Sequence, residues 1–416
     1  MTIRWIPILG TALSLIGSAL AQAPASVPRP PTAMSPTPVV SPTSVLTLGP
    51  EGVPASAPVE TEECGPIWLS ADMLMSFFYG ARVQPLFTTG PQTAPRSQAG
   101  VLNEPGTQVL FDGRMNEGLR SGVRVEGGYW FSPERHMGIE AGASVLESMA
   151  TVFGSFNDGG SVLARPYFNV NTKFNESVLV TYPNLASGGV TARVSSGNFY
   201  EAHVDLVENW WDRDGWRIDG LVGYRFYRYD EGLRIRQIST ITNDPVFTPT
   251  TTLYAGDDFS TQNEFHGAEL GLRSSYQWDN LNIEVLGKVA VGPLRRRVKI
   301  TGGQAISVPG SPDEQRPVGI FALPTNIGTY NYSDWSNLPE LGITLRYRLN
   351  EYVCVRAGYN ILFLNSISRA DQQLDARINP NFFSGGTETG LRDPRATELR
   401  DNVWIMNIGC GLEVAY

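Results

Sequence analysis

The chain has 416 residues, of which 18% are charged, below the roughly 25% that is usual in soluble domains. With 41 acidic and 32 basic residues, its formal net charge is −9, which argues against a nucleic-acid partner because nucleic-acid-binding surfaces are basic. Three cysteines cannot all pair internally, and three scattered histidines have no metal-ligand spacing, so we expect no disulfide framework, no metal and no cofactor.

Residues 1–23 predict a signal peptide. Arg4 precedes an apolar stretch from Trp5 to Leu20, and Ala19 and Ala21 form a small-x-small cleavage pattern, with Ala21 and Ala23 as a second choice. The alternative is a transmembrane anchor, but the stretch is short for a span of roughly 20 residues. Residues 24–62 alternate Pro with Ser, Thr and Val, which predicts an extended or disordered leader. We therefore expect an exported chain whose folded part covers 63–416.

From residue 67 onward, apolar residues recur at every second position, which predicts strand after strand. In 216–226, for example, Trp216, Ile218 and Val222 share one face, while Arg217 and Asp219 lie on the other. No amphipathic helix is predicted, so the fold class is all-β. The predicted strands are 67–78, 119–131, 137–148, 199–211, 216–229, 263–278, 281–292, 335–349, 352–366 and 402–416.

Such strands occur in soluble sandwiches, whose apolar faces form a core, and in membrane barrels, whose apolar faces meet lipid. Three features favour a barrel. Short connections (132–136, 212–215, 279–280 and 350–351) alternate with long ones (roughly 79–118, 149–198, 230–262, 293–334 and 367–401), and the strand count is even. Aromatic residues gather at strand ends, as in the girdles of membrane barrels: Tyr129-Trp130, Trp210-Trp211, Trp216, Trp278, Tyr347, Tyr352, Trp404 and Tyr416.

We therefore predict a transmembrane antiparallel up-and-down β-barrel of about 10 strands, with short periplasmic turns and long outer loops. Twelve strands are the alternative, because 230–262 is itself strand-like. That segment could extend a hairpin above the membrane or add two strands.

The last fifteen residues, NVWIMNIGCGLEVAY, form an alternating strand that ends on an aromatic. Outer-membrane proteins commonly end this way, although Phe is the usual last residue. We predict that Trp404, Leu412 and Tyr416 belong to an assembly signal. The expected partners are outer-membrane lipids and the barrel-assembly machinery, and a homo-oligomer is left open.

The polar faces of the strands supply candidate lumen-lining residues. They could line a water-filled pore, or they could pair across a narrow lumen and close it, since small barrels are filled by side chains. Long outer loops could also fold inward and plug the lumen. The candidates are Arg124, Glu126, Arg217, Arg225, Arg273, Glu284, Lys288, Arg346, Arg348 and Arg356.

Two further groups have a functional and a structural interpretation. Arg295 to Lys299 could select anions or grip lipopolysaccharide phosphates, or could be a solvated strand end. Asp257 and Asp258, with Glu264 and His266 nearby, could suggest a catalytic cluster, but there is no Ser elbow and no metal spacing, so we expect no enzyme.

The cysteines are expected to stay apart. Cys354 shares a face with Arg356, and Cys410 shares one with Trp404, so no bond between them is predicted. Cys64 precedes the first strand.

Several blocks along the body resemble the bacterial family named "β-barrel porin family seven". The resemblance implies an outer-membrane barrel of a Gram-negative-type bacterium but no particular solute. We expect a porin-like channel for passive diffusion of small polar solutes; the alternative is a closed structural or surface-interaction barrel. The blocks are QAGVLNEPGTQVLFDG (98–113), LRSGVRVEGGYWF (119–131), SVLARPYFNV (161–170), DEGLRIRQ (230–237), DDFSTQNEFHGAELGL (257–272), IEVLGKVAVG (283–292), FALPTNIGTY (321–330) and PELGITLRYRL (339–349).

Overall fold

A computed structural model describes residues 65–383 and 389–416. The predicted signal peptide (1–23), the predicted leader (24–62) and Cys64 lie outside these residues. In the described part of the chain, no helix is long and apolar enough to cross a membrane.

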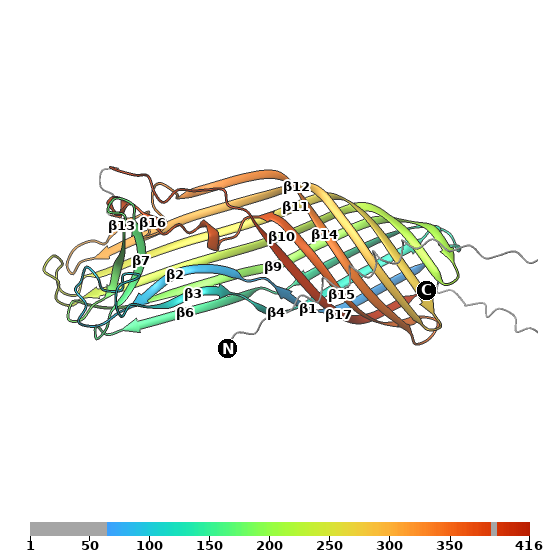
Figure 1. Cartoon of the computed structure of the whole chain (residues 1–416), viewed down its shortest axis with the longest axis horizontal. Helices are drawn as coiled ribbons and strands as arrows, with labels where there is room; N and C mark the ends of the chain where they lie inside the picture. The colour runs from blue at the N-terminus through green and yellow to red at the C-terminus, as the bar shows by residue number, and fades with distance from the viewer. Residues whose placement is uncertain (1–64, 384–388) are drawn as a thin grey trace, which may run out of the picture. The chain divides into compact units, whose positions relative to one another are not determined.

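Ten antiparallel strands close into a ring in the order β10-β11-β12-β14-β15-β17-β1-β4-β5-β9, with β9 returning to β10 (Figure 1). The first and last ring strands pair directly, with Met73 opposite Cys410. The ring strands are β1 (Ile67–Phe78), β4 (Gly118–Trp130), β5 (Met137–Leu146), β9 (Ala186–Arg213), β10 (Trp216–Ile241), β11 (Thr252–Trp278), β12 (Leu281–Ser307), β14 (Gly328–Arg348), β15 (Val353–Ile367) and β17 (Asp401–Ala415).

The predicted fold class is therefore confirmed, and each of the ten predicted strands overlaps one ring strand. Residues 230–262 do not add strands. They lengthen the hairpin of β10 and β11, which stay paired from Trp216 and Tyr276 up to Thr240 and Thr252.

Four neighbouring strands are much longer than a membrane crossing requires. Strands β9 to β12 have 28, 26, 27 and 27 residues, whereas a crossing strand needs roughly 9–11. Strand β6 (Met149–Asn157) continues the register of β5 along β9, since Leu146 pairs with Phe199 and Met149 with Ser196. We call the part of the ring beyond the membrane the outer extension.

Tight turns join the long strands at the other end. Asp214 and Gly215 link β9 to β10 with φ values of 54° and 81°, the left-handed pair that an Asp-Gly type I′ turn requires. Asp279 and Asn280 link β11 to β12 between the paired Trp278 and Leu281. The C-terminus lies at this same end (Figure 1), so we call it the periplasmic end.

A second sheet packs into the outer extension, at the end opposite the C-terminus (Figure 1). It has the order β16-β7-β2-β3, with β8 beside β7. Its strands are β2 (Ala81–Thr89), β3 (Gln108–Met115), β7 (Leu163–Asn169), β8 (Phe174–Thr181) and β16 (Arg377–Ile378). The remaining elements are β13 (Glu314–Arg316), which pairs with β12, and the 3-10 turns η1 (Asp371–Gln373) and η2 (Pro380–Phe382).

The outward face near the periplasmic end is apolar and exposed, for example at Met73 on β1, Val222 on β10 and Leu270 on β11. Exposed side chains of this size in a continuous band are what a lipid-facing surface requires. Trp130, which we placed in the aromatic girdle, is an exception. Its ring lies 4.9 Å from the guanidinium carbon of Arg217, which lines the barrel interior, because it occupies the inward phase of β4.

Candidate functional site in the barrel interior

The interior can be divided into four layers from the periplasmic end to the outer tip. The first is a vestibule, a hollow of about 200 Å³ that Trp68, Trp130, Arg217, Arg348 and Cys354 help to line. Above it lies the charged layer, whose members are Asp72, Arg124, Glu126, Glu140, Glu201, His203, Asp205, Arg225, Glu269, Arg273, Glu284, Lys288, Glu340, Arg346, Arg356 and Glu413.

The next two layers are mainly apolar, although each holds a buried arginine: Arg120 lies 4.0 Å from the Phe78 ring, and Arg165 pairs with Asp257. The aromatic layer includes Leu74, Phe78, Leu146, Phe199, Tyr227, Tyr229, Phe265, Leu294, Leu338, Leu362 and Ile405. The outer core joins the second sheet to the inner face of the outer extension, and it includes Leu86, Phe87, Phe111, Leu163, Leu233, Ile235, Phe259, Val298, Phe321 and Ile378.

Arg225 is the centre of the charged layer. Its Nη2 lies 2.5 Å from Glu201 Oε1, and its Nη1 lies 2.9 Å from Glu269 Oε2 and 2.6 Å from Glu340 Oε2. The Arg225 side chain is only 2% exposed. A buried cation of this kind needs partners, because removal from water strongly disfavours the charged form.

Other pairs cross the lumen between strands that are not neighbours in the ring. Arg273 on β11 places Nη2 2.6 Å from Glu140 Oε1 on β5, although β9 and β10 stand between these strands. Arg356 on β15 reaches Glu126 on β4 at 2.9 Å, and β17 and β1 lie between them. Such pairs tie together strands that are not neighbours in the ring and occupy part of the lumen between them.

Glycines on the inner face leave room for these long side chains. A Cβ at Gly223 would lie 2.0 Å from Asp205 Oδ1, and one at Gly142 would lie 2.5 Å from the His203 ring. Gly in a strand often marks such a close approach. Glycine at these two positions thus makes room for the side chains of Asp205 and His203.

The structure brings eight of the ten predicted lumen-lining residues into the charged layer and places the other two, Arg217 and Arg348, at the vestibule. The eight are Arg124, Glu126, Arg225, Arg273, Glu284, Lys288, Arg346 and Arg356. We missed most of the carboxylates that pair with them, although the same two-residue period marks them. These are Asp72, Glu140, Glu201, Asp205, Glu340 and Glu413.

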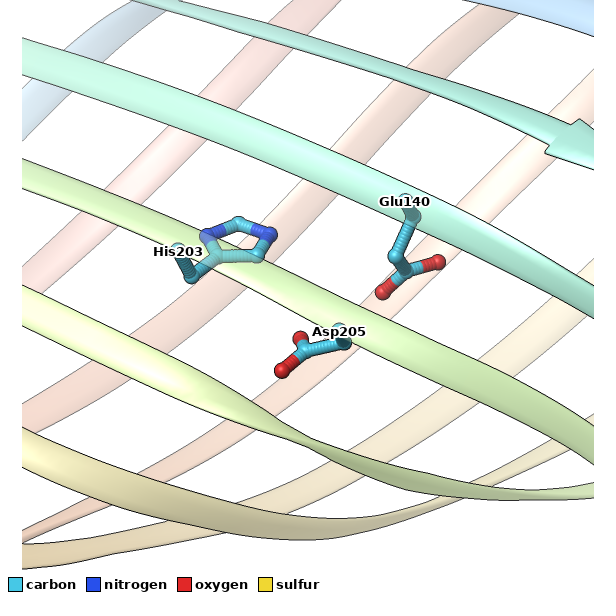
Figure 2. A group of neighbouring side chains, drawn as sticks. All are labelled: Glu140, His203 and Asp205. Atoms are coloured by element: carbon cyan, nitrogen blue, oxygen red, sulfur yellow. The ribbon is translucent and has the colours of Figure 1, made fainter.

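Glu140, His203 and Asp205 form a group whose potential ligand atoms lie within 4.8 Å of one another (Figure 2). Glu140 projects from β5, and His203 and Asp205 project from β9 into the lumen (Figure 2). The ammonium of Lys288 already lies 2.5 Å from Asp205 Oδ2 and 3.7 Å from Glu140 Oε1. The ammonium of Lys288 therefore lies where a metal ion would have to bind, and we do not assign a metal site to this group.

Asp257 and Asp258 do not form one cluster, because successive strand residues point to opposite faces. Asp257 is buried, and its Oδ1 accepts hydrogen bonds from the backbone N–H groups of Ile320, Phe321 and Ala322 at 2.8–2.9 Å. Its Oδ2 lies 2.5 Å from Arg165 Nη2. This carboxylate fixes a loop inside the outer core. Asp258 pairs outside with Arg234 and Arg236.

A second buried ion pair closes the base of the outer core. Arg369 Nη2 lies 2.8 Å from Glu231 Oε1, and both side chains are buried. Asp371 lies next to this pair and accepts a hydrogen bond from the backbone N–H of Arg82 at 2.8 Å. Burial, reinforced by the negative charge of Glu231, raises the pKa of Asp371 to about 6.

The C-terminal strand has its alternating residues on the outward face. Trp404 and Leu412 are exposed there, with Trp404 at the outer girdle and packed on Phe363 at 4.3 Å between ring centroids. Tyr416 lies at the periplasmic end and stacks on Tyr352 at 5.9 Å. Their role in assembly stays a prediction.

In the described residues, Cys354 and Cys410 form no disulfide with each other, as expected from their opposite faces. Cys410 is exposed on the outward face of β17, and Cys354 lines the vestibule.

Solved outer-membrane proteins have similar folds at very low identity. Outer membrane protease OmpT from Escherichia coli is 11% identical over 84% of this chain and 97% of that chain, with a TM-score of 0.37. A major outer membrane protein from Thermus thermophilus is 9% identical over 84% and 99%, with a TM-score of 0.23. An anion-selective porin from Comamonas acidovorans is 6% identical over 84% and 98%, with a TM-score of 0.18. At such low identity, the activities of these proteins cannot be transferred to this chain.

No curated protein matches the sequence. A family model does match. It is described as "Putative beta barrel porin-7 (BBP7)" and covers residues 68–416, most of the chain. This match confirms the resemblance found in the sequence blocks, and the chain belongs to this family of outer-membrane, porin-like β-barrels.

Proposed function

We propose that this protein is a closed outer-membrane barrel that anchors and presents its outer extension at the cell surface. The observation that carries the proposal is the aromatic layer. Phe78, Phe199 and Tyr229 are each at most 2% exposed, and Phe78 on β1 packs across the lumen on Phe199 of β9 and Tyr229 of β10 at ring-centroid distances of 6.3 and 5.8 Å. A polar solute would have to cross this apolar layer after passing the charged layer.

The outer core supports the same proposal. Apolar side chains of the second sheet, such as Phe87, pack with inward residues of the ring, such as Leu233 and Phe259. Packed cores of this kind are as dense as organic crystals and hold few voids larger than a water molecule. A barrel used only for diffusion would need neither the core nor ring strands of this length.

Passive diffusion of small polar solutes is the second candidate. The family description favours it, and so does the vestibule with its Arg217 and Arg348 side chains. We assign no reaction to either candidate. Asp257 is engaged by backbone groups of the outer core, while His266 pairs with Glu264 at 3.1 Å on the outward face.

Single-channel conductance in a planar bilayer separates the two candidates. The purified protein is first shown to be folded by its heat-modifiable migration on a gel. A closed barrel gives no conductance steps at protein amounts for which a general-diffusion porin, added as a control, gives many. Stable and uniform steps from the folded wild-type protein would sink the closed-barrel proposal and favour diffusion.

Surface presentation needs its own test. In a variant with Cys64, Cys354 and Cys410 changed to Ala, one new cysteine is placed either at Val246, in the tip of the β10–β11 hairpin and 80% exposed, or at Glu134, in a periplasmic turn. A membrane-impermeant maleimide added to intact cells should label V246C but label E134C only after the cells are broken. Equal labelling of both in intact cells contradicts the proposed orientation.

A further inference from the structure

The outward face of β12 changes character at Pro293. Below it, Val285, Val289 and Val291 are exposed and apolar. Above it, Arg295, Arg297 and Lys299 are exposed on the same face. These three residues, which we call the basic column, follow the lipid-facing residues of the same strand without interruption.

The basic column begins at the height where the lipid hydrocarbon ends. From Leu281 to Pro293 the strand climbs roughly 30 Å along the barrel axis, if each residue rises about 3.3 Å and the strand tilts by about 40°. Trp335 lies opposite Pro293 on β14 and is 76% exposed. Tryptophan at such a position is typical of the interface between hydrocarbon and head groups. Arg295 is the next outward residue above it.

No carboxylate in the described part of the chain pairs with the basic column. Glu264 lies opposite Arg295 in the sheet, but its Oε1 contacts His266 Nε2 at 3.1 Å instead. Ser333 faces Arg295 from the other side, on β14. The buried arginines of the lumen differ from the column, because ion pairs neutralise them, as they do Arg225 and Arg356. Three cations on one strand face without an anion repel one another and favour an anionic ligand.

A hollow beside the column has hydrogen-bond donors for such a ligand. It has a volume of about 370 Å³ and is lined by Arg295 and Arg297 together with polar residues of the two flanking strands. Arginine presents a planar fork that matches two phosphate oxygens. The one carboxylate that lines the hollow, Glu264, contacts His266 instead of Arg295. The flanking residues on the outward face are Gln262 and Glu264 on β11 and Asn331 and Ser333 on β14. Arg296 and Tyr332 also line the hollow, but from the inward phase of their strands.

A second hollow continues this surface upward. It has a volume of about 330 Å³, and Lys299 lines it together with Arg193 and Arg234. Arg193 and Arg234 lie directly opposite each other in the β9–β10 register, although Arg234 also pairs with Asp258 at 2.8 Å. The positive charge therefore extends above the column, where larger head groups reach.

We propose that the outward face of β12 holds a phosphate-bearing head group of an outer-leaflet lipid, with Arg295 and Arg297 contacting phosphate oxygens and Lys299 adding charge above them. The lipid's acyl chains then lie along the apolar face below Pro293. The height of the column favours a membrane lipid over free phosphate, because the cations lie directly above exposed hydrocarbon-facing side chains. This site lies outside the barrel and does not depend on whether the lumen is closed.

The test is native mass spectrometry of the folded, detergent-purified protein titrated with diphosphorylated lipid A. The wild-type protein should bind one lipid molecule with high occupancy. The variant R295Q/R297Q/K299Q should bind roughly 100-fold more weakly, because each surface cation near anionic lipid contributes about 1 kcal/mol. R295K/R297K keeps the charge but loses the planar fork, and we expect an intermediate loss of severalfold.

A matched variant controls for net charge. K173Q/R377Q/R395Q removes three positive charges from exposed positions in the second sheet and in the segment before β17 and should bind lipid A like the wild type. Heat-modifiable migration shows that each variant is folded.

Several results would overturn the proposal. They are unchanged lipid A binding by R295Q/R297Q/K299Q, an equal loss in the matched variant, or equal binding of lipid A from which the phosphates have been removed. Displacement of the lipid by millimolar inorganic phosphate would instead identify a free-anion site. None of these results bears on conductance, so this proposal and the closed-barrel proposal can fail separately.

Discussion

The membrane-spanning part and the outer extension use the same strands with opposite polarity. On β10, Val222 and Tyr224 point outward and Arg225 points inward near the periplasmic end. Further along the same strand, Arg234 points outward and Leu233 points inward. The alternation keeps its period of two, but its polar and apolar faces change places. The lower part is built for lipid outside and paired charges inside, whereas the upper part is built like a soluble domain.

Because of this difference, the two parts are stabilised by different interactions. The membrane-spanning part depends on pairing of buried charges, for which loss of one partner is costly. The outer extension depends on burial of apolar area, which contributes about 25 cal/mol per Å². Changes to the two parts should therefore act through different interactions and destabilise different regions of the protein.

The largest expected effect is that of Arg225→Ala. The change leaves Glu201, Glu269 and Glu340 buried without their shared cation, and we expect a loss of about 3–5 kcal/mol in the free energy of unfolding. Urea unfolding of the refolded protein, followed by tryptophan fluorescence, measures it. As a control, Arg316→Ala breaks an exposed pair with Glu314 and should cost less than about 1 kcal/mol. Equal effects of the two changes would contradict the dependence on buried pairing.

In the outer extension, Leu233→Ala should have a large but local effect. Leu233 is 1% exposed in the outer core, so the truncation should cost about 2–5 kcal/mol. Because the membrane-spanning part does not depend on this core, we expect faster proteolysis of the outer extension with unchanged heat-modifiable migration. Val222→Ala on the same strand faces lipid and is the matched control. If L233A instead abolishes heat modifiability, the two parts unfold together and the comparison fails.

The third prediction concerns pH. The pKa of Asp371 is about 6 in the folded protein, above its ordinary value of 3.8. The folded protein therefore holds the proton more tightly than the unfolded chain, and stability of the outer core should fall as the pH rises from about 4 to about 6. The expected loss is on the order of 2 kcal/mol. The midpoint of urea unfolding, reported by a fluorophore on V246C, measures it at pH 4 and pH 7.

Asp371→Asn is the control for this titration, because Asn can still accept the hydrogen bond from the Arg82 backbone N–H. The variant should lose most of the pH dependence and be more stable than the wild type at pH 7. The same pH slope in both proteins would show that other groups carry it.

The ring could be predicted from the sequence because a strand that faces lipid on one side has an apolar residue at every second position. All ten ring strands follow from that period, and so does the inward phase of Arg124 and Arg356. The pairing of the charges could not be predicted, because Arg273 and Glu140 come from strands separated by two others. Trp130 was misplaced since its neighbour Tyr129 is a girdle residue, although the phase of Val123 and Val125 already placed Trp130 inside.

The outer core was the least predictable part. Residues such as Leu86, Phe87 and Phe321 lie in long connections without a clear period, so they resembled loops. Their burial depends on a surface that exists only after β9 to β12 have paired above the membrane. Asp257 could not be interpreted from the sequence for the same reason, because its partners are backbone groups 63 to 65 residues away and the Arg165 side chain 92 residues away.

The smallest expected effect on the folded protein comes from the last residue. The Tyr416 ring stacks on Tyr352, so Tyr416→Ala should lower the free energy of unfolding by only about 0.5–1.5 kcal/mol. Removal of Tyr416 should nevertheless lower the amount of protein in the outer membrane, if the terminal aromatic is part of the assembly signal. Tyr416→Phe, which keeps an aromatic ring, should restore that amount. Immunoblots of outer-membrane fractions measure it beside the urea unfolding. Unchanged levels of the truncated protein would leave the strand end with only a packing role.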